Sequence, residues 1–187
     1  TPCPPEVASI SLHPVVKPLV IILLVGTILT SGWIASASAT ENCLPGDVCY
    51  GVKMATEKTQ AIVVAMTGTQ KDKAKLHLEF ASRRAKEVKK VVEVKQKEAP
   101  KQVEATIQKL EDSIKTVNDT IKNVKENEPQ NILEVKQEVE KKTDEIKQTL
   151  SEVDEKAGGV DMSEATKVVK DTNLAAIEAV VITKSAG

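Results

Sequence analysis

The stretch VEATIQKLEDSIKTVNDTIKNV, residues 103–124, decides the fold that this sequence predicts. Its apolar side chains recur at alternating intervals of four and three residues, which is the a and d spacing of a heptad repeat. No polar residue interrupts this seam. The predicted core seam consists of Val103, Ile107, Leu110, Ile114, Val117, Ile121 and Val124. We therefore expect a long helix that buries one narrow face against other helices.

Two helices are expected on the N-terminal side of this seam. The first runs from Val48 to about Met66 and ends at Gly68, and Thr69 with Asp72 forms a capping box for the second. Side chains three or four residues apart give each helix one face for the core. The face of the first helix consists of Val52, Ala55, Thr59, Ile62 and Met66. That of the second consists of Ala74, Leu78, Ala81, Ala85, Val88 and Val92.

Helix-breaking residues set the two ends of the helix that carries this seam. Pro100 predicts a turn or sharp kink near Ala99, and Asn127 and Pro129 end the helix. A fourth helix then carries a weaker stripe, which Lys136 and Thr143 dilute. That stripe consists of Ile132, Val139, Ile146, Leu150 and Val153. Because the connection is short, we expect the third and fourth helices to pair as an antiparallel hairpin from Val103 to Val153.

The C-terminal segment is more apolar than the helices before it. Gly158 and Gly159 form a flexible joint, and Ser163 can begin a last helix that contains LAAIEAVVITK, residues 174–184. One interpretation is that this helix packs back on the bundle. The alternative is that it docks on a partner or on a second copy of the chain.

Composition favours long helices over a loop-rich enzyme. Only 8 Gly and 8 Pro are present, and one Trp, one Tyr and one Phe leave aliphatic side chains to form the core. Lys plus Arg total 26 and Asp plus Glu total 27, so no net charge favours nucleic acid. We predict an all-α fold, either an elongated up-and-down helical bundle or an antiparallel coiled-coil hairpin, after an N-terminal signal sequence.

A strongly apolar stretch near the N-terminus is typical of a secretory signal. LVIILLVGTIL, residues 19–29, contains no charge, follows Lys17 and precedes small residues that end in an A-x-A pattern. We expect cleavage after Ala39, so that the mature chain begins at Thr40. The preceding residues, 1–14, fit neither a signal nor a domain, and we expect them to be untranslated.

Two other interpretations of this apolar stretch stay open. In the first interpretation the stretch is a buried core helix. In the second it is an uncleaved membrane anchor, because with Trp33 and Ile34 it approaches the ~17–20 residues that span a bilayer.

The sequence as a whole divides into four predicted segments. They are a signal or untranslated part at 1–39, a disulfide turn with a first helical hairpin at 40–98, a coiled-coil hairpin at 99–157 and the joint with its apolar helix at 158–187.

Cys43 and Cys49 bracket a Pro-Gly turn directly after the predicted cleavage site. In an exported chain the compartment is oxidising, and the turn can bring the two Cα atoms within bonding reach. We therefore predict a disulfide, which stabilises the fold by about 2 kcal/mol because the ring is small. No metal site is expected, because His77 is the only histidine of the mature chain.

The same region resembles a bacterial family of exported domains of unknown function. That family has an LPG-x-x-x-Y-x-x-K-x-x-x-E opening and then an L-H-L-x-x-A-x-R-R segment. The matching residues are Leu44, Pro45, Gly46, Asp47, Tyr50, Lys53, Glu57, Leu76, His77, Leu78, Ala81, Arg83 and Arg84. This chain departs from the pattern at Cys43 and Cys49, and at Gly51, where Pro is usual. The resemblance implies export and a helical fold, and it implies no activity.

The motif residues also have structural interpretations of their own. Asp47 can cap the first helix, and Glu57 lies four residues after Lys53, on one exposed face. His77, Arg83 and Arg84 can pair with Glu57 or Asp47 and so form a polar clamp between two helices. A ligand or metal role for His77 is the alternative.

These patterns predict a module without catalysis. One mature histidine and two paired cysteines exclude a Ser-His-Asp or Cys-His set, no Gly-rich phosphate loop exists, and we expect no cofactor. We expect a structural or protein-interaction role in the cell envelope, through a protein partner or self-association by helical faces. The chain would be secreted or tethered, and would meet a membrane only if the signal is uncleaved. The alternative function is an extracytoplasmic sensor or periplasmic-type chaperone that binds clients or metal along a helical groove.

Overall fold

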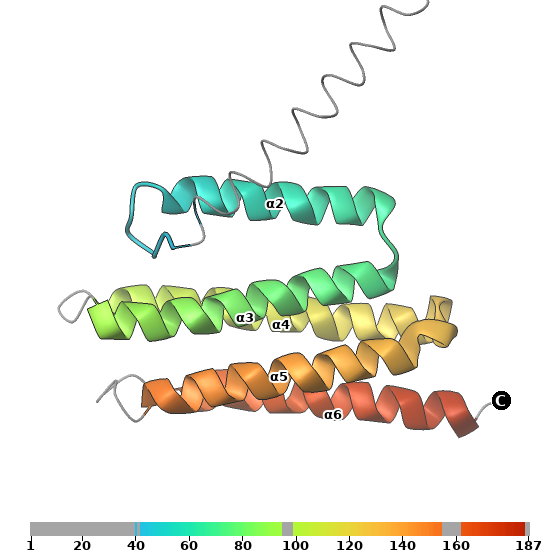
Figure 1. Ribbon diagram of the computed structural model, residues 1–187. Helices are drawn as coiled ribbons and strands as arrows, with labels where there is room; N and C mark the ends of the chain where they lie inside the picture. The colour runs from blue at the N-terminus through green and yellow to red at the C-terminus, as the bar shows by residue number, and fades with distance from the viewer. Residues whose placement is uncertain (1–39, 41, 95–98, 155–161, 186–187) are drawn as a thin grey trace, which may run out of the picture. The chain divides into compact units, whose positions relative to one another are not determined.

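The computed structural model describes residue 40 and residues 42–94, 99–154 and 162–185, and all the regular elements within them are helical. Figure 1 shows their arrangement. The elements are α2 (Tyr50–Thr67), α3 (Gln70–Val94), α4 (Ala99–Asn127), the short 3-10 helix η1 (Pro129–Asn131), α5 (Ile132–Asp154) and α6 (Ser163–Ser185). The all-α prediction is therefore confirmed. The export segment and the Gly158–Gly159 joint lie outside the described residues and stay predictions.

The described residues from Asn42 onwards form one compact unit, and the helix ends within it follow local chemistry. Gly68 ends α2 where its backbone N–H donates to the carbonyl of Val64, and a Cβ atom there would lie 2.8 Å from that carbonyl oxygen. The predicted capping box is present, because Thr69 N–H donates to Asp72 Oδ2 at 2.9 Å and Asp72 N–H donates to Thr69 Oγ1 at 3.2 Å.

A second group caps α3 from far along the chain. Glu128, directly after α4, accepts hydrogen bonds from the backbone N–H groups of Gln70, at 2.7 Å, and Lys71, at 3.4 Å. The bond from Gln70 is the main cause that lowers the pKa of Glu128. This contact joins the end of α4 to the start of α3, so the two helices run antiparallel.

Helices α3 to α6 form a four-helix bundle in which the chain neighbours α4 and α5 lie on a diagonal. In the bundle α3 packs against α4 and α5, and α6 packs against the same two helices, while α4 and α5 make few direct contacts (Figure 1). The predicted direct pairing of the third and fourth helices is therefore wrong. The reason is that α3 and α6 lie between them, and Ala81, Ala85 and Ala165 allow close packing on the seam of α4.

The predicted core seam is buried along its whole length, and it divides between two apolar clusters. Val103, Ile107, Leu110 and Ile114 belong to one cluster, and the rest of the seam belongs to the other. On α5 and α6 the buried residues between these clusters include Thr143 and Thr172, whose hydroxyls donate to carbonyls of their own helices. Thr143 thus lies inside the core without an unpaired polar group.

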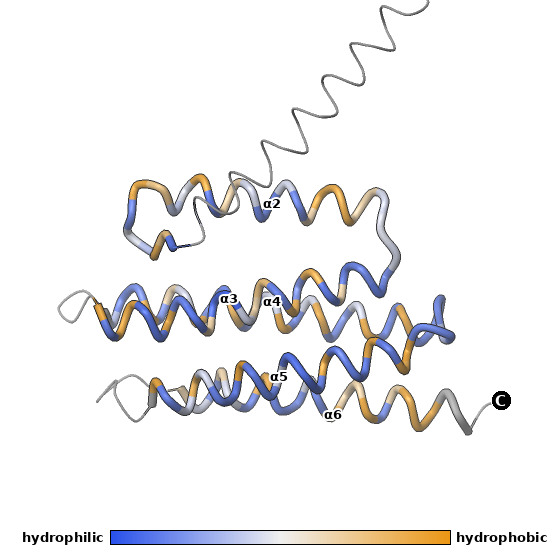
Figure 2. Tube along the Cα trace, in the orientation of Figure 1, coloured by the Kyte–Doolittle hydropathy of each residue, from blue (hydrophilic) through white to orange (hydrophobic). Residues whose placement is uncertain are grey.

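The first helix contradicts the prediction for its buried face. All the residues predicted to face the core, Val52, Ala55, Thr59, Ile62 and Met66, are exposed. We call this set the outer face of α2. The buried residues are instead Tyr50, Lys53 and Glu57, and α2 packs chiefly against α3. Figure 2 shows apolar residues in α2 as well as in the bundle helices. Among the helices of the described part, none is apolar over a length that could cross a bilayer.

Candidate functional site

A tight turn fixes the start of the site. Asp47 N–H donates to the Leu44 carbonyl at 2.9 Å, with Pro45 second and Gly46 third, and Gly46 has φ 92°. This is the geometry of a type II turn, which requires positive φ at its third residue. Asp47 does not cap α2 as predicted. Its Oδ2 accepts the N–H of Leu44 at 2.7 Å and so closes the turn. The residue at the cap position is Cys49, whose side chain makes no capping hydrogen bond.

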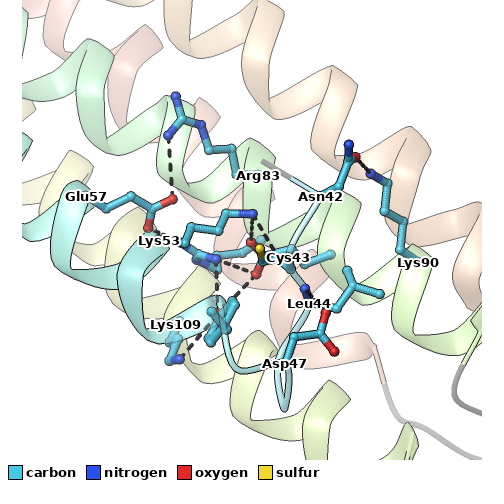
Figure 3. Close-up of polar contacts among 12 residues, drawn as sticks. Asn42, Cys43, Leu44, Asp47, Lys53, Glu57, Arg83, Lys90 and Lys109 are labelled. Atoms are coloured by element: carbon cyan, nitrogen blue, oxygen red, sulfur yellow. Dashed lines mark hydrogen bonds and ion pairs between the residues drawn. The ribbon is translucent and has the colours of Figure 1, made fainter. Parts of the chain in front are cut away.

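The disulfide closes this turn, and Leu44 and Asn42 fasten it to the bundle. Cys43 and Cys49 are bonded, with their Cα atoms 5.8 Å apart, as the sequence predicts. Leu44 is buried in the same apolar cluster as Ala81 and Ala85 of α3. Beside it, Lys90 Nζ donates to Asn42 Oδ1 at 3.0 Å (Figure 3). The N-terminus of α2 is therefore held at a fixed place on α3.

Next to the turn lies a buried set of charged and hydroxyl groups. We call this set, Tyr50, Lys53, Glu57, Arg84 and Glu87, the polar cluster; all its members are buried. The Arg84 guanidinium bonds both Glu57 and Glu87, and Lys53 Nζ lies 2.6 Å from Glu87 Oε1. Lys53 and Glu57 were predicted on an exposed face. That prediction is wrong, because the residues beneath α2 are the opposite charges of α3.

The predicted clamp between two helices is present in part. Arg84 pairs with Glu57, and Arg83 Nη1 lies 3.6 Å from Glu57 Oε1 (Figure 3). His77 is not brought to either predicted acid. Its ring lies edge-on to Phe80, with the ring centroids 5.7 Å apart, and burial lowers the pKa of His77.

Tyr50 connects the polar cluster to α4. Its hydroxyl donates to Glu87 Oε2 at 3.2 Å and accepts from Arg84 Nη1 at 3.1 Å and from Lys109 Nζ at 3.3 Å. Burial raises the pKa of Tyr50 well above its ordinary value, and Arg84 opposes this effect more weakly. Burial alone would lower the pKa of Arg84, but Glu87 and Glu57 raise it. The cluster therefore holds a neutral phenol and charged groups that pair with one another.

Two residues of this site, Glu87 and Lys109, were not predicted from the sequence. Glu87 lies three residues after Arg84 on α3, so helical spacing was a usable signal. Lys109 lies between two seam residues of α4, where a lysine is expected to face solvent. No local pattern indicates its contact with Tyr50, which is 59 residues away.

A groove of about 460 Å³ runs beside the polar cluster, between α2, α3 and α4. Its walls include Met54, Ala61 and Phe80, and the hydroxyls of Ser113 and Thr116 there donate to carbonyls of their own helix. Charged side chains, among them Glu57 and Arg84, line part of the groove, but its open surface is mostly apolar, and a groove of this size and character suits a small ligand. Among the residues described, no three His, Cys, Asp or Glu side chains lie where they could hold a metal ion.

Comparison with known proteins gives one result. Residues 42–157 match the model of a family described as "Domain of unknown function (DUF5667)", and the chain belongs to that family. No curated protein and no solved structure matches the chain. The match agrees with the predicted resemblance to a family of unknown function, whereas the individual motifs stay a prediction. It covers the turn, the polar cluster and the groove, and ends before α6.

Proposed function

We propose that this member of the DUF5667 family is a non-catalytic helical module that works outside the cytoplasm, in the cell envelope, by binding another protein or a second copy of itself. The observation that carries the proposal is the orientation of α2 about its own axis, which turns its apolar side to solvent. Val52, Ile62 and Met66 are 54%, 51% and 81% exposed, while the opposite side of the helix is fastened to the bundle by ion pairs. A folded chain gains free energy by burying such side chains, and a contiguous apolar patch on a surface marks an interaction site.

The charge of α2 favours an apolar partner surface. Lys58 is the one exposed charged residue of this helix, because Lys53 and Glu57 are buried. Nothing on the outer face of α2 would therefore select a charged partner. An apolar groove or a helix with an apolar stripe would bury the face without leaving a charge unpaired.

A second exposed apolar set supports the same role. Leu174, Ile177 and Val181 of α6 are exposed and lie three or four residues apart, so they share one side of the helix. The other side of α6 packs on the bundle through residues that include Val169 and Ala176. Both predicted interpretations of this helix are thus compatible, since one face packs on the bundle and another is free to dock.

The location outside the cytoplasm is supported by two features. One is the apolar segment at 19–29 with its small-residue cleavage pattern. The other is the disulfide between Cys43 and Cys49, because such bonds persist in oxidising compartments.

A chaperone that holds unfolded chains is the second candidate, and the groove beside α2 favours it. Such a chaperone would suppress the aggregation of a heated client at stoichiometric concentration, whereas an interaction module with one partner would not. Variants that add charge to the outer face of α2 would leave groove-based suppression unchanged.

The experiment that tests the proposal is site-specific crosslinking in the native envelope. A photoreactive residue is placed at Ile62, on the outer face of α2, and as a control at Lys122, an exposed position of α4. We expect a discrete adduct from Ile62 and none from Lys122. If Ile62 gives no adduct, or both positions give the same products, the outer face of α2 is not the binding surface.

A further inference from the structure

The groove between α2, α3 and α4 is lined by more cationic side chains, Lys58, Arg84 and Lys109, than carboxylates, Glu57 and Asp112. Lys109 lines the groove, where its Nζ donates to the hydroxyl of Tyr50 and lies 4.7 Å from the centroid of that ring. Within the described part of the chain, no carboxylate lies within ion-pair distance of Lys109. The neighbouring cations Lys53 and Arg84 each have a carboxylate partner. Lys109 therefore differs from them in lacking an acid.

The surroundings of Lys109 favour an anion there. Partial burial, and then the positive charge of Arg84, lower the pKa of Lys109, and the carboxylates of Glu87 and Glu57 oppose this only in part. A carboxylate beside the ammonium would offset both effects. Glu57 and Arg84 also line the groove, but they pair with each other. Lys58 and Asp112 line it too, but they are exposed and of opposite sign, so solvent screens their effect on the groove.

The walls of the groove favour a hydrocarbon chain over a peptide. A peptide brings backbone N–H and C=O groups that need partners when they are buried. The hydroxyls of Ser113 and Thr116 already donate to the carbonyls of Lys109 and Asp112, at 2.9 Å each. Met54, Ala61 and Phe80 offer apolar surface only, which an acyl chain can cover without unpaired polar groups.

We propose that this groove binds a fatty acid, with the acyl chain against Met54, Ala61 and Phe80 and the carboxylate at Lys109. The groove shares only Ala55 with the outer face of α2, so this proposal does not depend on the proposed function. Lys109 suits such a ligand because its side chain contributes both a cation and an apolar stem.

The methionines of the chain make the test direct, because the three lie in different environments. Met54 lines the groove, Met66 lies on the outer face of α2, and Met162 is buried in the bundle core. With ¹³C-methyl methionine in the exported chain, titration with dodecanoate below its micelle concentration should shift the Met54 signal. Met66 and Met162 should stay unchanged. A shift at Met66 alone, or none at all, would overturn the proposal.

Two matched comparisons separate the contribution of the ligand's carboxylate to affinity from that of its acyl chain. Calorimetry should give dodecanoate an affinity at least roughly ten-fold higher than dodecanol, because a charge-assisted hydrogen bond is present only in the acid. Lys109→Gln should remove this preference, while Lys115→Gln, an exposed lysine of the same helix, should keep it. Equal affinity for acid and alcohol in the unsubstituted chain would contradict the assignment of Lys109.

A further variant guards against loss of fold. Ala61→Leu adds volume inside the groove and leaves the polar cluster unaltered, so both ligands should bind more weakly while the Met162 signal stays in place. Unchanged binding in Ala61→Leu would place the ligand elsewhere and overturn the proposal.

Discussion

The bundle helices and α2 carry similar apolar periodicity, yet they use it in opposite ways. In α4 each seam residue, from Val103 to Val124, is buried. In α2 the stripe that includes Val52 and Ile62 is exposed, and the buried side consists of a tyrosine, a lysine and a glutamate. Periodicity therefore identifies which face of a helix is apolar. Whether that face is buried depends on what the neighbouring elements offer.

The neighbour of α2 offers charges. On α3, Ala81 and Ala85 turn to the bundle core, while Arg84 and Glu87 meet the side chains of α2. A buried charge without a partner costs several kcal/mol, so these groups select the polar side of α2. An apolar stripe placed there would leave Arg84 and Glu87 without partners from α2.

The largest effect is expected in the bundle. Ile114→Asp would place an unpaired carboxylate at a site with no exposure, at a cost of about 5 kcal/mol, comparable to the stability of a small domain. Lys115→Asp, at the exposed neighbouring residue, should change the free energy of unfolding by about 0.5 kcal/mol or less. Circular dichroism during urea unfolding measures both. Equal losses would mean that the seam is not the core.

A smaller and more local effect is expected at the polar cluster. Arg84→Met would leave Glu57 buried with only the longer contact to Arg83, at a cost of about 3 kcal/mol. Arg83→Met removes a side chain that is 33% exposed, so it should cost under about 1 kcal/mol.

Hydrogen exchange tests where this loss occurs. In Arg84→Met the amides of α2 should lose protection while those of α4 keep it, because the ion pairs join α2 to a bundle that has its own apolar core. If α2 and α4 lose protection together, α2 is an integral part of the bundle and the contrast between the two regions fails.

The free energy of unfolding is also expected to depend on pH through His77, by less than the loss expected from Arg84→Met. Burial lowers the pKa of His77 below its ordinary 6.5, so between the folded and the ordinary pKa the unfolded chain binds more protons. The contribution of His77 is complete above about pH 7.5 and is lost as pH falls through 6.5 towards the folded pKa. His77→Gln should flatten this dependence in urea titrations across that range. An unchanged slope would mean that His77 is solvated in the folded chain.

How much of the fold was predictable depends on the range of each interaction. The seam of α4 and the capping box of Thr69 and Asp72 follow from local spacing, and the structure has both. The partner of each helix does not follow, because one narrow apolar stripe can cover another in many pairings. The diagonal placement of α4 and α5 shows this limit.

The candidate site was predictable to a smaller extent. The pairing of Arg84 with Glu57 and the bond between the two cysteines were expected from motif and spacing. The burial of Lys53 was not, because a lysine on a helix surface is normally solvated and only the place of Glu87 reverses this. Lys109 reaches Tyr50 through the tertiary arrangement of three helices, which no sequence interval records.

One substitution tests the contrast between the two regions most directly, because the same chemical change can be made in each. Ile62 is 51% exposed on the outer face of α2, and Ile114 has no exposure. Ile62→Asp should lower the free energy of unfolding by about 0.5 kcal/mol or less, because the new carboxylate stays in water. Urea unfolding, beside Ile114→Asp under the same conditions, gives the comparison. A loss at Ile62 as large as that at Ile114 would mean that the apolar stripe of α2 is buried in the folded chain, and would contradict the account.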